Sequence, residues 1–146
     1  MRIEQVAATG FGPLVGQVLD LAPAMTVVVG GNETAKSSWH AATYAAVCGI
    51  RRGRGQAHER DRNFRARHQP WDGGPWRVGA RIVLDDGRAV EITQELDERV
   101  DCRAIDLGLA RDVSGEIMND GTVDASMWLG LGRRAFEATA CIRQGD

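Results

Sequence analysis

The most constraining feature of this 146-residue chain is a glycine-bearing loop between an apolar segment and an alanine-rich segment. Met25-Thr26-Val27-Val28-Val29 is a continuous apolar, β-branched run, which is typical of a strand buried on both faces. The run ends at Gly30-Gly31. The residues after Lys36 contain neither glycine nor proline until Gly49, the usual residue just past a helix end. A strand that leads through a short loop into a helix indicates the α/β class.

The loop sequence, Gly30-Gly31-Asn32-Glu33-Thr34-Ala35-Lys36-Ser37, predicts a phosphate site. It matches the pattern Gly-x-x-x-x-Gly-Lys-Ser/Thr, except that Ala35 takes the place of the second glycine. In that pattern the backbone N–H groups converge on phosphate oxygens, and the helix N-terminus adds partial positive charge. Lys36 is the only lysine beside seventeen arginines. We expect Lys36 to neutralise the β- and γ-phosphates and the Ser37 hydroxyl to bind Mg²⁺.

Two alternatives stay open for this loop. It can be a glycine-rich strand-to-helix turn with an exposed lysine, and it can be a phosphate loop of reduced affinity. Ala35 places a β-carbon where the pattern has none, and that atom either crowds a bound phosphate or strains the backbone. We therefore expect weakened nucleotide binding, unless a small shift of the loop accommodates the methyl group.

The rest of the chain is predicted to be mainly short strands. Asp85-Asp86-Gly87-Arg88 separates two alternating segments, and Asp-Gly in such a place predicts a β-hairpin. The predicted strands are 2–8, 15–21, 25–29, 76–84, 89–95, 99–105 and 139–143, and the predicted helices are 37–48, 113–118 and 133–137. Residues 51–75 are predicted to be a loop or flexible insertion.

Charge is segregated along the chain. Between residues 51 and 67, seven arginines stand against Glu59 and Asp61, so this stretch carries +5 and the remainder of a chain of net charge −2 carries −7. Arg51, Arg52 and Arg54 are the candidates for contacts with DNA phosphates. A solvated loop and a docking site for an acidic partner are the alternatives.

The remaining composition points to a folded, reduced protein. Three widely spaced cysteines form no Cys-x-x-Cys pair, so neither a zinc site nor a redox couple is indicated. The charged start and the lack of a long apolar stretch predict a cytoplasmic chain without a membrane span. His40 is predicted to be structural, and His58 and His68 lie in the basic loop without a spacing that suggests a metal site. The tryptophans Trp71, Trp76 and Trp128 are predicted to pack the insertion and the core, with an exposed ring as the alternative for Trp71 beside Pro70.

These motifs resemble the N-terminal end of SMC-like repair ATPases, including SbcC-type subunits and the YhaN-like AAA proteins. Phe11-Gly12-Pro13-Leu14 and its spacing to the 26–29 run carry the likeness. So does the loop, which in that family commonly reads Gly-Pro-Asn-Glu-Ala-Gly-Lys-Ser-Ser. The terminal Arg143-Gln144-Gly145-Asp146 is similar to the family's Q-loop, so Gln144 would approach Mg²⁺ and the attacking water. The residues that the resemblance assigns to nucleotide binding are Gly30, Gly31, Asn32, Glu33, Thr34, Ala35, Lys36, Ser37 and Ser38.

The resemblance implies an α/β P-loop NTPase fold. The chain would be the N-terminal lobe of an ABC/SMC-type head with an antiparallel β-hairpin subsheet, divided into 1–50, 51–75 and 76–146. ATP and Mg²⁺ are the implied cofactors. The implied partners are a C-terminal ATPase lobe in cis or trans, a second head and DNA. In that family the C-terminal lobe carries the signature, Walker B and switch histidine, so turnover by this chain alone is not expected. The rival hypothesis is a degenerate, truncated lobe that binds no ATP and acts as an interaction module.

Two short segments resemble the Walker B and signature motifs that the family carries in its C-terminal lobe. Ile82-Val83-Leu84-Asp85-Asp86 looks like a Walker B strand, but the glycine that follows favours a hairpin. Val113-Ser114-Gly115-Glu116 looks like a signature motif with one glycine missing, but Ser114 as a helix cap is the simpler interpretation.

Overall fold

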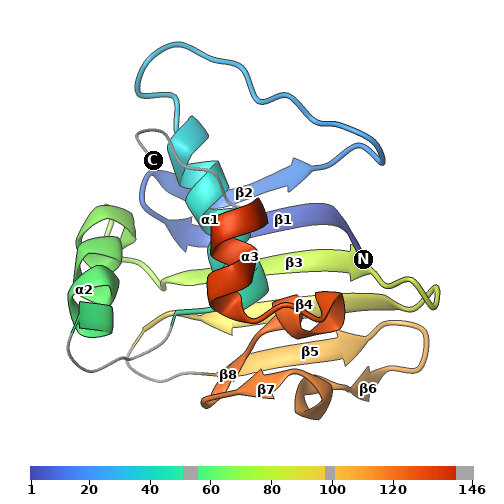
Figure 1. The fold of residues 1–146 in the computed structure, drawn as a ribbon. Coiled ribbons are helices and arrows are strands. Elements are labelled where there is room, and N and C mark those ends of the chain that lie inside the picture. Colours follow the sequence, from blue (N-terminus) through green and yellow to red (C-terminus); the bar gives the residue numbers. More distant parts are fainter. Residues whose placement is uncertain (51–55, 98–100, 141–146) are drawn as a thin grey trace.

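The computed structural model of the chain describes residues 1–50, 56–97 and 101–140, and its described elements are a large antiparallel sheet, a small one and several helices (Figure 1). The large sheet holds β1 (Arg2–Phe11), β2 (Leu14–Asp20), β3 (Arg77–Val83), β4 (Ala89–Glu95), β5 (Cys102–Asp106) and β6 (Arg111–Asp112). The small sheet holds β7 (Met118–Asn119) and β8 (Thr122–Val123). The α-helices are α1 (Lys36–Cys48), α2 (Gln56–His68) and α3 (Arg133–Ala140), and the 3-10 helices are η1 (Ser114–Glu116) and η2 (Ala125–Leu129).

The strand order of the large sheet is β2-β1-β3-β4-β5-β6, and each neighbouring pair is antiparallel. The expected hairpin is confirmed, because β3 pairs with β4 from Arg77↔Glu95 to Val83↔Ala89 around the Asp-Gly turn. The mixture of helices with an antiparallel sheet agrees with the predicted α/β class.

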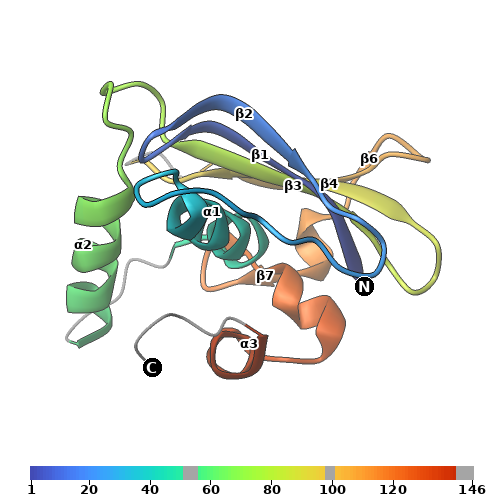
Figure 2. The same cartoon turned by 90° about the horizontal axis from the view of Figure 1, so that it is seen from above.

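The core lies between one face of the sheet and α1. Val78, Ala80 and Ile82 alternate along β3 with more exposed residues, and the α1 segment from Ala41 to Cys48 is largely buried against this face. Figure 2 shows the helices on this side of the sheet, with α3 beyond α1. Alanine-rich α1 can lie close to the strands because its side chains are small. The sheet therefore holds α1, and with it the start of α1, in a defined place.

The 25–29 segment is not the buried strand that its pattern predicts. It forms no strand in the structure, and Met25 is 76% exposed and Val29 85%. Figure 1 shows it as part of a long connection between β2 and α1. A strand buried on both faces needs neighbouring strands to bond its backbone. No strand in the described ranges pairs with this segment.

The prediction of a loop over 51–75 is wrong for its middle part, which forms α2. Residues 56–69 contain no glycine or proline, and they place Glu59 in the first turn of the helix and basic residues in the last, which suits the helix dipole. Phe64 and His68, four residues apart, both pack on Phe11. Because arginines dominate the composition of this stretch, composition alone does not reveal the aromatic pair. Residues 51–55 lie outside the described ranges.

The C-terminal part also departs from the predictions. The strand predicted over 139–143 is contradicted at its start, where α3 continues to Ala140, and its remainder lies outside the described residues. The strand predicted over 99–105 is found as β5 from Cys102, and its first two residues lie outside the described ranges. The helix predicted over 113–118 shrinks to η1, because β7 begins at Met118. Ser114 is not a helix cap, since its hydroxyl accepts a hydrogen bond from the Ala104 N–H at 2.8 Å. In the described part of the chain, no helix has the length and apolar character needed to cross a membrane.

Two of the three tryptophans singled out in the sequence lie in or against the core. Trp76 is 1% exposed in the core, and Trp128 packs partly buried against it. Trp71 is 77% exposed, so it does not pack the insertion and the alternative of an exposed ring holds. Its backbone N–H bonds the Gly12 carbonyl at 3.1 Å, which anchors the main chain and leaves the ring in solvent.

Candidate functional site

The predicted phosphate loop connects the exposed 25–29 segment to the first turn of α1. α1 begins at Lys36, so Lys36, Ser37 and Ser38 form its first turn, whose backbone N–H groups have no partner within the helix. Ser37 is exposed, and Lys36 and Ser38 are half-buried. The first turn of α1 contains no acidic residue, so the positive end of the helix dipole is not cancelled there. The start of α1 is therefore a place where an anion could bind.

Two residues of the loop adopt the left-handed backbone conformation although neither is glycine. Ala35 has φ 61° and ψ 14°, and Glu33 has φ 64°. Ala35 occupies the position where the phosphate-loop pattern has its second glycine, and the structure shows why glycine suits that position. An L-residue in this region costs about 1–2 kcal/mol. The strain expected from Ala35 is therefore present in the backbone.

The Lys36 ammonium lies over the start of the loop. Its Nζ donates to the carbonyl oxygens of Gly30, at 2.8 Å, and Gly31, and lies 3.3 Å from the Thr34 hydroxyl oxygen. Thr34 in turn donates to the Gly31 carbonyl at 2.8 Å. These contacts curl residues 30–36 into a closed turn with the positive charge inside it.

The turn Phe11-Gly12-Pro13-Leu14 lies beside this loop. A β-carbon on Gly12 would lie 3.7 Å from the Ser38 hydroxyl oxygen and 4.0 Å from the Cα of His68. The Gly12 N–H donates to the His68 carbonyl at 2.8 Å, and Gly12 itself has φ +53°. The end of α2, the β1–β2 turn and the start of α1 thus meet at one place, although 26 and 56 residues separate Gly12 from the other two in the chain.

Several predicted site residues cannot be placed. Gln144, Arg51, Arg52 and Arg54 lie outside the described residues. On α2, Arg62 and Arg67 are exposed, whereas the Arg65 guanidinium lies 5.3 Å from the centroid of the Trp76 ring. Asn32 and Glu33 are exposed in the loop. The structure brings together Gly30, Gly31, Thr34 and Lys36 by hydrogen bonds, and joins Ala35, Ser37 and Ser38 to them through the chain.

Sequence reasoning missed a contact at the other end of α1. Arg133 of α3 donates to the Tyr44 hydroxyl at 2.8 Å and to the carbonyl oxygens of Cys48 and Gly49 at 3.2 and 2.6 Å. Burial raises the pKa of Tyr44 to about 12, and the nearby guanidinium opposes that rise. No spacing in the sequence predicts a partnership over 89 residues. A cation at the C-terminus of α1 complements the helix dipole and ties α3 to the helix that carries Lys36.

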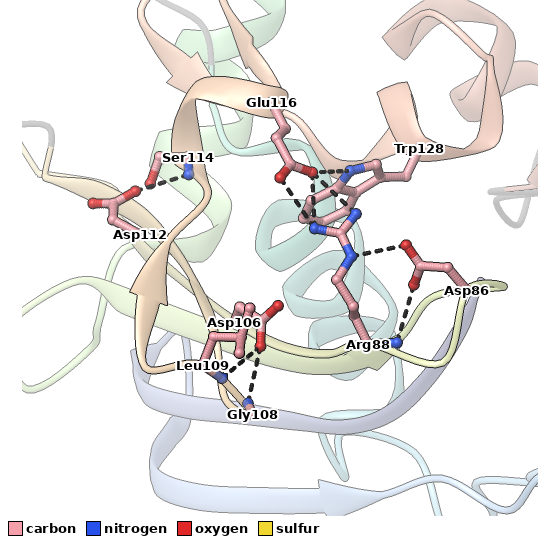
Figure 3. A network of polar contacts seen from close by, with 9 residues as sticks. All are labelled: Asp86, Arg88, Asp106, Gly108, Leu109, Asp112, Ser114, Glu116 and Trp128. Atoms are coloured by element: carbon pink, nitrogen blue, oxygen red, sulfur yellow. Dashed lines mark hydrogen bonds and ion pairs between the residues drawn. The ribbon is translucent and has the colours of Figure 1, made fainter.

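The two strings that imitate catalytic motifs form a separate polar network (Figure 3). Arg88 pairs with Asp86 at 2.8 Å and with Glu116 at 3.0 Å, and the Trp128 indole N–H lies 3.4 Å from Glu116. Hydrogen bonds from Arg88 lower the pKa of both carboxyl groups, and these partners raise the pKa of Arg88. The β3–β4 turn that holds Asp86 lies far from the start of α1 in both Figure 1 and Figure 2. Its acids serve structure, and the hairpin interpretation is confirmed.

The other face of the sheet carries a shallow hollow of about 240 Å³. Ala7, Gly79 and Thr93 form one cross-strand row in its floor, and the ion pair of Arg81 with Glu91 lies beside them at 3.8 Å. The hollow therefore lies away from the loop and from α1. Among residues 1–50, 56–97 and 101–140, no cluster of three histidine, cysteine or acidic side chains could hold a metal ion.

Comparison with known families identifies the family of almost the whole chain. The sequence profile of a family described as an AAA domain matches residues 1–144. The chain belongs to this AAA-domain family. The match supports a nucleotide-binding module of the ATPase type, and ATPases of this kind generally use ATP and Mg²⁺. No curated protein sequence matches the AAA-domain chain.

Proposed function

We propose that this AAA-domain chain is the Mg-ATP-binding N-terminal lobe of an SMC-like ATPase head that serves DNA repair or DNA-end processing. The observation that carries the proposal is Lys36. It is the only lysine of the chain, it starts a helix fixed by the core, and its ammonium lies inside the turn made by Gly30, Gly31 and Thr34. In this interpretation Lys36 binds phosphate, Ser37 binds Mg²⁺ and Gln144 organises water.

The residues of the loop fit Mg-ATP in chemistry. The first turn of α1 offers backbone N–H donors without a competing acid, and the exposed Ser37 hydroxyl is a hard oxygen ligand of the kind that Mg²⁺ uses beside phosphate oxygens. Magnesium-bound ATP would supply the charge that Lys36 and the helix end attract.

Isothermal titration calorimetry with millimolar Mg-ATP tests the proposal. We expect weak heat with the wild-type chain, stronger heat with Ala35→Gly and none with Lys36→Met. Lys36→Met keeps an unbranched side chain and removes the charge, so it separates phosphate recognition from helix formation. No heat with either the wild type or Ala35→Gly would overturn the proposal.

The exposed segment 25–29 supports a partner lobe. Its apolar side chains are 40–85% exposed at Met25, Val27, Val28 and Val29, and no strand within the described ranges pairs with its backbone. A strand from a C-terminal ATPase lobe, in cis or trans, would cover these residues and supply the parallel neighbours that the apolar pattern requires.

Hydrolysis by the chain alone is not part of the proposal. The Asp86 and Glu116 carboxylates are both paired with Arg88. The β3–β4 turn, which contains residues 86 and 88, lies far from the start of α1 (Figure 1). We expect steady-state phosphate release near background. Turnover of about 1 s⁻¹, abolished by Asp86→Asn, would restore the Walker B interpretation of 82–86 and contradict the assignment as one lobe.

A second candidate function is an interaction module that binds no nucleotide, and the left-handed Ala35 favours it. DNA would be one partner, through the exposed Arg62 and Arg67 of α2 and the arginines of 51–55. Backbone contacts make affinity for duplex DNA fall with salt, with a log-log slope of about −0.9 per phosphate neutralised. Replacing Arg51, Arg52 and Arg54 with alanine should flatten that slope. No binding by the wild type at about 50 mM salt would exclude the DNA role.

A further inference from the structure

We propose that Thr34 reduces the affinity of the predicted phosphate loop, because its hydroxyl competes with a bound phosphate for a hydrogen bond from the Lys36 ammonium. The inference rests on the proposed function of the loop. It concerns a residue of the loop whose type the phosphate pattern leaves open, since position 34 is one of the unspecified places between the first glycine and the lysine.

The argument starts from the number of donors. A lysine ammonium has three N–H donors and no acceptor. In the structure Nζ of Lys36 has three acceptors around it, namely the carbonyl oxygens of Gly30 and Gly31 and the hydroxyl oxygen of Thr34. The two carbonyl contacts shape the turn. A bound phosphate oxygen would have to replace one of these three acceptors, and the contact with Thr34 is the longest of them.

The Thr34 side chain is held in that place from two sides. Its hydroxyl donates to the Gly31 carbonyl at 2.8 Å, so its lone pairs are free to face Lys36. It also packs against the first glycine of the loop, because a β-carbon on Gly30 would lie only 2.4 Å from the Thr34 hydroxyl oxygen. The hydroxyl therefore lies inside the turn with the ammonium, where a phosphate oxygen would otherwise be the acceptor.

The consequence is a competition between an internal acceptor and a ligand. The contact of 3.3 Å is long for a hydrogen bond, so a charged phosphate oxygen would displace it, but at a cost in affinity. Removal of the hydroxyl should strengthen binding of phosphate-bearing ligands by about three- to fivefold, which is the effect of one modest hydrogen bond. Thr34 and Ala35 then reduce affinity by different routes, one through the lysine and one through the backbone.

The first experiment needs no nucleotide. Lys36 is the only lysine, so an amine-reactive reagent labels two groups in the intact chain, Lys36 and the α-amino group of Met1, which peptide mass spectrometry separates. The Met1 amine contacts Asp85 and provides an internal reference. We expect faster labelling of Lys36 in Thr34→Val, which keeps the branched shape and loses the hydroxyl. Thr34→Ser keeps the hydroxyl and should label like the wild type. Equal rates in all three proteins would overturn the proposal.

The second experiment separates this proposal from the proposed function. Binding of Mg-ATP and of Mg-pyrophosphate is measured by calorimetry in Ala35→Gly and in the double variant Thr34→Val/Ala35→Gly. Tighter binding of both ligands by the double variant supports the role of Thr34, and equal affinity refutes it while the loop remains a nucleotide site. Absence of binding in both proteins overturns the proposed function, and with it any role of Thr34 in affinity, whatever the labelling rates show.

Discussion

Replacement of Ala35 by glycine should raise both the stability of the chain and its affinity for Mg-ATP. Ala35 has φ 61°, where an L-residue costs about 1–2 kcal/mol relative to its preferred regions. Glycine removes that cost but loses about 0.5–1 kcal/mol through the freedom it adds to the unfolded chain. The expected net gain in the free energy of unfolding lies between about 0 and 1.5 kcal/mol.

Two measurements separate the two effects. Thermal unfolding followed by circular dichroism should show a midpoint raised by a few degrees, since about 1 kcal/mol corresponds to roughly 2–4 °C in a chain of this size or somewhat larger. Calorimetry should show tighter Mg-ATP binding, because the β-carbon leaves the position where the backbone approaches phosphate. The gain in stability comes from relief of the left-handed backbone strain, and the gain in affinity comes from the space that the missing β-carbon leaves for phosphate.

Glu33 supplies the matched control. It has φ 64°, so Glu33→Gly relieves the same kind of strain two residues before the second-glycine position. Both variants should be stabilised, but Ala35→Gly should gain more affinity than Glu33→Gly, which also loses a negative charge near the ligand. A lower unfolding midpoint for Ala35→Gly would refute the strain argument. No gain in affinity for Ala35→Gly would show that the β-carbon at position 35 does not limit binding.

Three further predictions concern the framework around the loop. Arg133→Met should lower the free energy of unfolding by about 1.5–3 kcal/mol in chemical denaturation, because it leaves the carbonyls at the end of α1 without their charged donor, whereas Arg134→Gln on the exposed side of α3 should have little effect. Arg88→Met should flatten the loss of stability on acidification. The pKa of Glu116 is lowered in the folded chain, so this carboxylate stabilises the fold above its ordinary pKa of about 4.5 and loses that contribution as the pH falls below it, which urea titrations across pH 3–6 would detect. Gly10→Ala should cost about 1–3 kcal/mol by the same assay, since a β-carbon there would lie 2.3 Å from a backbone carbonyl oxygen.

The candidate site shows which of its parts local sequence can predict. The glycines, the lysine and the serine of 30–37 lie next to one another in the chain, so their spacing alone indicates a loop at a helix start. Contacts that depend on how distant elements pack have no such signal. Gly12 lies close to Ser38, and Arg133 hydrogen-bonds the carbonyls at the end of α1. Both contacts join segments that are distant in the sequence and that only the folded sheet brings together.

The errors in the predicted fold have physical causes of the same kind. The arginines of 56–68 suggested a solvated loop, because four arginines in thirteen residues outweigh two aromatic contacts in any average over composition. Phe64 and His68 nevertheless dock the segment on Phe11 and make it a helix. In the 25–29 segment the apolar pattern is that of a buried strand, but burial requires a neighbour, and the described chain offers none.

The sequence by itself determined the α/β class, the hairpin of β3 and β4, the helix α1 and the place of the glycine-bearing loop at the start of α1. Each depends on residues close together in the chain, through turn chemistry, alternation or helix propensity. Only the tertiary structure decided that Ala35 is left-handed, that Thr34 occupies the third donor of Lys36 and that the acids of 85–86 are paired away from the loop. Backbone angles and the direction of a lysine side chain depend on how the loop closes against the start of α1, and this is a property of three-dimensional packing that neighbouring residue types do not specify.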